Sequence, residues 1–294
     1  MKLLNFQKDG VQHFGVVTKK GIISVTEASA QSKVGMASSM VELMEQGDQG
    51  HQNLTAMIEL FEQENWEIPV YQEEDIEFLP VVQHPSKILC VGLNYRAHIE
   101  EAKHDMPTYP VIFSKSQNAL AGHRASIPYV SSVGKYDYEA ELVIVIGKPA
   151  TNVQEEDALS YVFGYTAGND VSARDLQKRT SQWHLGKSLD GFGPVGPYLV
   201  TRDAIDPQDL HIACRVNGEV RQQARTSAML FSCQHLIHYL STFMTLQPGD
   251  LIFTGTPEGV IMGYPSDQQV WLQPGDIIEV EIEKIGVLRN TLKN

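Results

Sequence analysis

Two glutamates separated by a single residue, Glu139 and Glu141, stand at the start of an apolar run. Alternate side chains of a β-strand project from the same face, so the two carboxylates would share one surface, with Cα atoms about 6.5–7 Å apart. An exposed strand edge of alternating polarity would also contain such a pair. However, the apolar residues 142–146 that follow are typical of a strand buried on both faces. Buried carboxylates repel each other unless a cation lies between them, so the pair predicts a cation site.

A third carboxylate, that of Asp170, ends the segment of residues 162–170, which has the pattern of a strand. Its place at the strand end suits a site, although Asp170 could equally cap the helix expected to begin near residue 172. Three carboxylates without a neighbouring histidine or cysteine form a hard oxygen site, which favours Mg²⁺ or Mn²⁺ over Zn²⁺ or copper. A metal held in this way keeps open positions for water or for a chelating substrate.

Lys187 lies in a segment, residues 183–197, that is rich in glycine and proline. Such a segment follows a fixed irregular path, so a lone lysine within it could face a pocket. The alternative is an ordinary lysine on the surface, where most lysines lie.

A histidine and a glutamate three residues apart, His98 and Glu101, follow a predicted strand at residues 87–91. On a helix these two positions lie on one face and within reach of each other. A histidine held by a carboxylate is a common general base near neutral pH, whereas an exposed helix would carry the same pair as an incidental ion pair. The polar, proline-containing residues 103–110 that follow predict a mobile cover over the site.

The elements that must position these side chains fall into two parts. Strand-like residues 2–7, 11–17 and 21–26, followed by helical periodicity near residues 40–44 and 57–61, predict a small N-terminal α/β domain over residues 1–80. A connector with two prolines leads to a second domain, residues 84–294, in which strands predominate. We expect this domain to be mainly β, with a curled sheet or barrel. Its predicted strands cover residues 87–91, 111–114, 138–146, 164–169, 198–201, 211–216, 251–254 and 277–282.

The composition restricts the classes of protein. The chain has 294 residues, 42% of them hydrophobic and 20% charged, which is typical of a globular protein and not of a disordered one. Its formal charge of −13 argues against nucleic acid as a partner. No stretch reaches the roughly 20 apolar residues that a membrane span needs, and the first residues lack a signal-like apolar core. The three widely spaced cysteines predict reduced thiols and a cytoplasmic protein.

Five short motifs occur in a specific order along the chain. They are Asn-Tyr-x-x-His at residues 94–98, Glu-x-Glu at 139–141, Asp-x-Ser-Ala-Arg-Asp-x-Gln at 170–177, Gly-Lys-Ser at 186–188 and Gly-Thr-Pro-x-Gly at 255–259. In this order, residues 84–294 resemble the fumarylacetoacetate hydrolase family. The resemblance implies the family's curled β-sheet or β-roll catalytic domain, a divalent metal and a homodimer.

The resemblance also implies roles for individual residues. The implied metal ligands are Glu139, Glu141 and Asp170. Lys187 would lie beside the bound substrate, and His98 with Glu101 resembles the dyad of acylpyruvase-like members. The positions that contact substrate in the family correspond to Arg174, Gln177 and Thr256.

The expected site suits a small-molecule 2-oxo acid, because adjacent open positions on a metal fit a carboxylate and its neighbouring oxo group. A cation there stabilises the enolate that forms when a bond next to the oxo group breaks. Our leading hypothesis is hydrolytic C–C cleavage of a 2,4-dioxo acid, in which His98 deprotonates the attacking water. The alternatives on the same site are decarboxylation of oxaloacetate and isomerisation of a 2-hydroxyhepta-2,4-diene-1,7-dioate-type compound. A non-enzymatic alternative is a metal-dependent protein that binds a 2-oxo acid.

Overall fold

The N-terminal part of the chain is a three-stranded meander packed against helices. The computed structural model describes residues 1–32 and 35–294. The strands are β1 (Lys2–Lys8), β2 (Val11–Thr18) and β3 (Gly21–Ser24). Between β1 and β2, Asp9 and Gly10 both have positive φ angles, which is the conformation that a tight Asp-Gly hairpin turn requires. The three predicted strands are confirmed, except that residues 25–26 begin a helix instead of extending β3.

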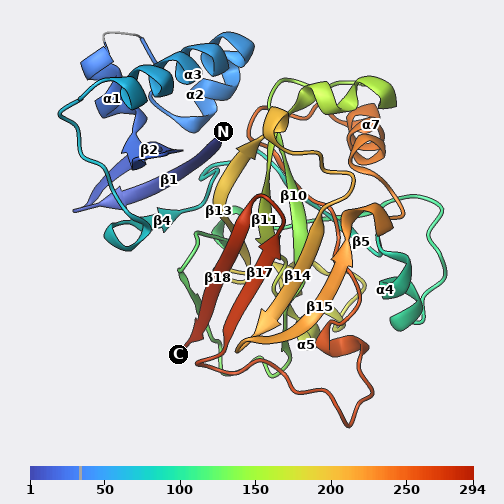
Figure 1. Ribbon diagram of the computed structural model, residues 1–294. Helices are drawn as coiled ribbons and strands as arrows, with labels where there is room; N and C mark the ends of the chain where they lie inside the picture. The colour runs from blue at the N-terminus through green and yellow to red at the C-terminus, as the bar shows by residue number, and fades with distance from the viewer. Residues whose placement is uncertain (33–34) are drawn as a thin grey trace.

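That unpredicted helix is explained by burial. In α1 (Val25–Ser32) the side chains of Val25 and Ala28, three residues apart, are buried on one face. The two helices predicted from apolar periodicity are present as α2 (Met40–Glu45) and α3 (Gly47–Gln63). Figure 1 shows these elements, in blue, gathered on one side of the molecule.

Most of the strands belong to two sheets, and the predicted strand-rich architecture with α/β elements is confirmed. The larger has the strand order β3-β2-β1-β13-β11-β10-β16-β5-β6, with β4 beside β1 and β7 beside β13. The smaller has the order β15-β14-β17-β18-β8. The remaining strands of the larger sheet are β4 (Glu77–Leu79), β5 (Ile88–Gly92), β6 (Val111–Ser114), β7 (Leu120–Ala121), β10 (Ala140–Ile146), β11 (Val162–Asn169), β13 (Gly193–Thr201) and β16 (Leu251–Phe253). Those of the smaller sheet are β8 (Ser126–Pro128), β14 (His211–Val216), β15 (Glu219–Arg225), β17 (Ile277–Ile282) and β18 (Gly286–Lys293).

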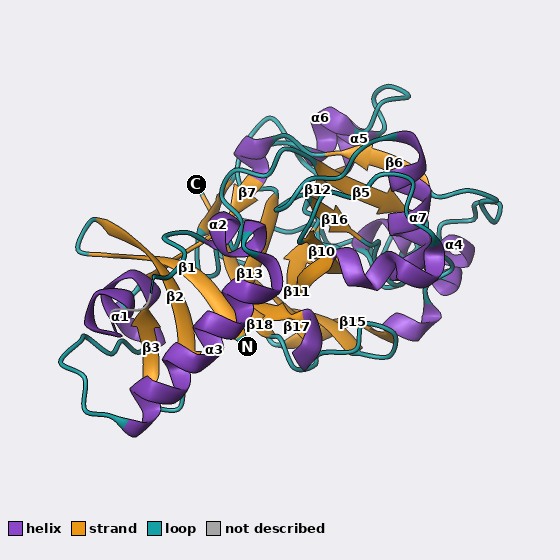
Figure 2. Ribbon diagram, turned by 90° about the horizontal axis from the view of Figure 1, so that it is seen from above, coloured by secondary structure: helices purple, strands orange, loops and turns teal. Residues whose placement is uncertain are grey.

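Short elements and helices surround the sheets, as the view in Figure 2 shows. A two-stranded pair joins β9 (Tyr136–Asp137) to β12 (Ser172–Ala173). The helices of this part are α4 (Arg96–Glu101), α5 (Arg174–Gln177), α6 (His184–Lys187) and α7 (Cys233–Phe243).

The larger sheet runs across the predicted domain boundary. Strand β1 pairs with β13 in antiparallel register, with Lys2 opposite Val200 and Leu3 opposite Leu199. The N-terminal strands therefore extend the sheet that carries β10 and β11. The division into domains at residues 80–84 stays a prediction.

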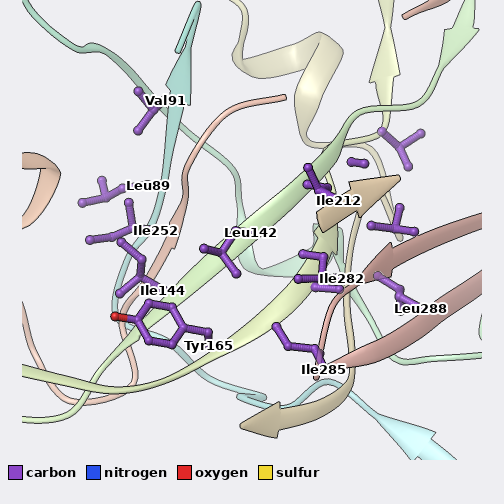
Figure 3. Close-up of a cluster of buried hydrophobic side chains, with 14 of the residues drawn as sticks. Leu89, Val91, Leu142, Ile144, Tyr165, Ile212, Ile252, Ile282, Ile285 and Leu288 are labelled. Atoms are coloured by element: carbon purple, nitrogen blue, oxygen red, sulfur yellow. The ribbon is translucent and has the colours of Figure 1, made fainter. Parts of the chain in front are cut away.

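Strand β10 is buried on both faces, as its apolar run predicts. Leu142 and Ile144 face the smaller sheet, where they pack in one hydrophobic cluster with residues such as Ile212 and Ile282 (Figure 3). Val143 and Val145 belong to a second cluster, which includes buried side chains of α2 and α3. The odd-numbered face of β10 is the face that also carries the two glutamates at its start.

Two further expectations concern membranes and thiols. Among residues 1–32 and 35–294, no helix is long and apolar enough to span a membrane. Cys90, Cys214 and Cys233 are free and buried.

A buried histidine links β4, β18 and the turn before β8. The ring of His123 packs edge-on against Phe78, with 4.7 Å between the ring centroids. Its Nδ1 accepts a hydrogen bond of 3.0 Å from the backbone N–H of Arg289. Burial, together with the charges of Arg124 and Arg289, lowers the pKa of His123 to about 4. The fold therefore requires the neutral imidazole.

This requirement predicts a pH dependence of stability. Because the pKa of His123 is lower in the folded than in the unfolded chain, the unfolded chain binds more protons between about pH 6.5 and 4. The free energy of unfolding, measured in urea, should therefore fall as the pH is lowered through this range. In His123→Asn, which keeps an acceptor for Arg289 but does not titrate, the fall should be smaller. Equal slopes in the two proteins would contradict the assignment.

Candidate active site

The pairing of β10 with β11 brings three carboxylates together. In this antiparallel register Ala140 lies opposite Asn169, and the N–H of Asp170 donates to the carbonyl oxygen of Glu139 at 2.9 Å. Glu139 and Glu141 flank Ala140, so both lie beside Asp170. One oxygen from each of the three carboxylates lies within 4.8 Å of the others, and all three residues are buried. Glu139 is the residue just before β10, but its carboxylate still lies close to that of Glu141.

A glycine two residues after β16 contacts the site. The N–H of Gly255 donates to Glu141 Oε2 at 2.6 Å. Gly255 has a φ of +96°, and a Cβ there would lie 2.8 Å from the Cβ of Asn94. The side chain of Asn94 is itself fixed, since its amide donates to the carbonyl oxygen of Thr254 at 2.7 Å. The Asn-Tyr-x-x-His and Gly-Thr-Pro motifs therefore pack against each other and hold the carboxylate of Glu141 in place.

The ammonium group of Lys187 lies against two of the three carboxylates. Its Nζ is 2.7 Å from Glu139 Oε2 and 2.8 Å from Asp170 Oδ2, and the residue is buried. The glycine before it allows α6 to approach α5, because a Cβ on Gly186 would lie 2.4 Å from the backbone nitrogen of Gln177. Lys187 is therefore part of the site and not a surface lysine.

Arg174 supplies a second positive charge. Its Nη2 is 2.6 Å from Glu139 Oε1 and its Nε is 2.9 Å from Asp137 Oδ2. Its Nη1 donates to Gln177 Oε1 at 2.9 Å. Asp137 also accepts hydrogen bonds from the backbone of Ile261 and Met262, which fixes the guanidinium beside Glu139.

The positive charges are distributed unequally over the triad. Burial alone would raise the pKa of Glu139, but Lys187 and Arg174 outweigh it and hold this pKa below its usual value. Burial raises the pKa of Glu141 well above its usual value, and the charges of Asp170 and Glu139 raise it further. Negative charge at Glu141 is therefore not balanced by the protein. Three convergent buried oxygens with a charge deficit of this kind fit a divalent cation.

The His98–Glu101 pair lies beside the triad, on α4. His98 Nδ1 is 3.2 Å from Glu101 Oε2, and Glu101 Oε1 accepts a hydrogen bond of 3.0 Å from the N–H of Gly259. Only 6% of the surface of His98 is exposed. The helix thus places the pair in the interior of the protein, so the pair is not an incidental ion pair on the surface.

One cavity of about 270 Å³ joins these groups. Its walls include apolar side chains of Val91, Phe113 and Trp183. This volume is slightly below the usual range for drug-sized ligands, so it suits a small metabolite. The site residues predicted from sequence that line it are His98, Glu139, Glu141, Arg174, Gln177, Lys187 and Thr256. Glu101 contacts His98 and lines the adjoining cavity. Asp170 belongs to the site because its carboxylate lies within 4.8 Å of those of Glu139 and Glu141.

Three buried polar residues escaped the sequence analysis. Lys115 Nζ contacts the Oδ1 of Asp170 and the carbonyl oxygen of Lys187, and its side chain is fully buried. Asp137 holds Arg174, as described above. The amide of Gln222, in β15, bonds Ala140, Thr256 and Pro257. Asp137 stands two residues before Glu139, which is a usable signal, whereas Lys115 is far in the sequence from the five motifs and nothing in the alternation of β15 distinguishes Gln222.

Comparison with known proteins gives a consistent set of relatives. Residues 87–293 match the family model described as fumarylacetoacetate (FAA) hydrolase C-terminal. The mitochondrial oxaloacetate tautomerase Fahd2a of Rattus norvegicus is 38% identical over 292 residues, which cover 99% of this chain and 91% of that protein. Two solved structures also match the full length of this chain. The fumarylacetoacetate hydrolase of Exiguobacterium antarcticum has 36% identity and a TM-score of 0.82, with 99% of that chain covered. The 5-carboxymethyl-2-hydroxymuconate delta-isomerase of Mycobacterium smegmatis has 32% identity and a TM-score of 0.76, with 98% covered.

The contacts of Lys115 predict a large effect on stability. In Lys115→Met, the buried carboxylate of Asp170 loses one of its two ammonium partners. Removing one partner of a buried ion pair costs about 3–5 kcal/mol, and urea titration should show a loss of this size. The control is Lys19→Met, which breaks the exposed Lys19–Glu62 pair and should change stability only slightly. Similar small losses in both variants would contradict a structural role for Lys115.

The charge deficit at Glu141 predicts a metal-dependent stabilisation. Added Mg²⁺ or Mn²⁺ should raise the melting temperature, because a ligand present at 100 times its Kd stabilises the folded state by about 2.7 kcal/mol. Glu141→Gln keeps an acceptor for the N–H of Gly255 but removes the charge, so most of this stabilisation should disappear. Glu59→Gln, at an exposed position on α3, should respond to metal as the unaltered protein does. An equal shift in all three proteins would mean that the metal binds elsewhere.

Proposed function

Since the chain belongs to the fumarylacetoacetate hydrolase family, as its motifs predict, we propose that it interconverts the enol and keto forms of a small 2-oxo diacid with the help of a divalent metal. The observation that carries this proposal is the meeting of a histidine–glutamate pair with the acidic triad and Lys187 at one cavity. Glu139, Glu141 and Asp170 would hold the metal. Bound Mg²⁺ or Mn²⁺ supplies Lewis-acid polarisation of the 2-oxo group.

In this proposal Lys187, Glu101 and His98 have separate roles in the reaction. Lys187 places a buried positive charge at the triad, next to the oxygen on which charge develops. Glu101 accepts from His98 Nδ1, which leaves the Nε2 of the ring free to act on the substrate. His98 would take the proton of the enol hydroxyl and return a proton to the neighbouring carbon. The overall change moves one proton from oxygen to carbon, so neither water nor another reactant is consumed.

Two of the relatives favour this reaction over our leading sequence-based hypothesis of C–C hydrolysis. The oxaloacetate tautomerase and the delta-isomerase described above both match nearly the whole chain. Hydrolysis of a 2,4-dioxo acid is the second candidate, supported by the likeness to the Exiguobacterium antarcticum hydrolase. In that reaction His98 would deprotonate the attacking water.

The proposal predicts a specific loss of activity. With Mg²⁺ or Mn²⁺, the protein should speed the decay of the enol absorbance of oxaloacetate. His98→Ala should lower this rate about 10²–10⁴-fold, the usual contribution of a general base. The variant should keep the metal-induced rise in melting temperature. His211→Ala, in β14 and outside the cavity, is the matched control and should retain full activity.

Product analysis separates the competing reactions. A tautomerase leaves the composition of the substrate unchanged, a decarboxylase releases CO₂ and pyruvate, and a hydrolase converts an acylpyruvate into two acids. Metal-dependent binding of oxaloacetate without any of these changes would identify a binding protein and contradict the proposal of an enzyme.

A further inference from the structure

A second compartment opens beside the catalytic cavity. It has a volume of about 460 Å³ and shares His98, His104, Lys178 and Met262 with the first cavity. His98 therefore borders both compartments. A ligand whose 2-oxo acid end lies at the acidic triad would extend past His98 into this outer space.

The outer compartment has a basic lining in an acidic protein. Lys103, His104 and Lys178 all line it, whereas Glu101 is the only carboxylate among its described lining residues. The charge of Glu101 is already engaged by His98 and by the N–H of Gly259. With a formal charge of −13 for the whole chain, this local excess of positive charge favours an anion in the outer compartment.

Lys178 is held at a fixed distance from the metal ligands. It follows α5, and its backbone N–H donates to the carbonyl oxygen of Arg174 at 3.1 Å. Arg174 in turn contacts Glu139. The backbone of Lys178 is thus linked to the triad through α5, and Lys178 lines both cavities.

Lys103 and His104 approach from the end of α4. The N–H of Lys103 donates to the carbonyl oxygen of Glu100, and that of His104 donates to Ile99, both at 3.1 Å. This is the glycine-type ending of a helix, and Lys103 occupies its left-handed position with a φ of +54°. A lysine there is unfavourable for the backbone, which is consistent with a use for its charge.

We propose that Lys178, assisted by Lys103, binds the distal carboxylate of the substrate and makes the site selective for 2-oxo diacids over 2-oxo monoacids. The inference rests on the proposed function, because it assumes that the 2-oxo acid end lies at the triad. It adds a specificity-determining group at the opposite end of the ligand. His98 then faces the carbon between the two anchored ends, which is the carbon that exchanges its proton.

The test compares two probes of equal carbon number by calorimetry in the presence of Mg²⁺. They are 2-oxoglutarate, which has the distal carboxylate, and 2-oxopentanoate, which has a methyl group in its place. The unaltered protein should bind 2-oxoglutarate more tightly. Lys178→Gln should weaken the binding of 2-oxoglutarate about two- to fivefold, the range expected for an exposed charge pair, and leave the binding of 2-oxopentanoate unchanged.

Three further variants and a change of ionic strength complete the test. Lys178→Arg keeps the charge and should keep the preference for the diacid, and Lys103→Gln should reduce it less than Lys178→Gln does. Lys293→Gln, an exposed lysine in β18 outside both compartments, should have no effect. Higher ionic strength should reduce the preference for the diacid.

If Lys178→Gln weakens the binding of both probes equally, or if the unaltered protein does not prefer 2-oxoglutarate, the inference is overturned. These outcomes are separate from a failure of the proposed function, because binding is measured without turnover. Oxaloacetate tautomerisation without diacid preference would reject the outer site alone. A diacid preference that depends on Lys178, in a protein without tautomerase activity, would support the outer site and reject the reaction.

Discussion

The electrostatic problem of placing three carboxylates in a buried position governs the rest of this structure. The register of β10 against β11 sets Asp170 opposite Glu139, which is two residues from Glu141. Carboxylates so close together in the protein interior are costly unless cations offset their charge. The chain supplies part of that charge itself and leaves a deficit at Glu141, which a divalent cation would fill.

The neighbouring elements provide the balancing charges and hold them in place. Lys187 and Lys115 contact opposite oxygens of Asp170, and Arg174 contacts Glu139. Each cation comes from a different segment: α6, the residue after β6, and α5. Strand pairing within the larger sheet therefore has a direct chemical consequence, because a shift of either β10 or β6 would separate a carboxylate from its counter-ion.

The His98–Glu101 pair is placed by a different part of the fold. Helix α4 follows β5, at the same end of the sheet as the triad, and brings His98 to the cavity with Glu101 beside it. The same helix end brings Lys103 and His104 to the outer compartment. The acidic triad, the His98–Glu101 pair and the basic groups thus line two neighbouring cavities in turn, an order suited to the proposed ligand with an oxo acid at one end and an anion at the other.

The sequence by itself determined the local features of this site. The two-residue period of a strand put Glu139 and Glu141 on one face, the helical spacing joined His98 to Glu101, and the ordered motifs identified the family. These features depend on near neighbours in the chain, where backbone geometry decides the outcome. The strand-rich architecture and most strands followed from apolar patterns for the same reason.

Only the tertiary structure decided which distant residues meet. The place of Asp170 beside the glutamates depends on strand register, and the roles of Lys115 and Gln222 depend on segments about 55 and 80 residues away. Burial on one face made residues 25–32 a helix, against the strand predicted to reach residue 26. Contacts of this kind arise from the packing of whole elements, so no spacing within a single segment encodes them.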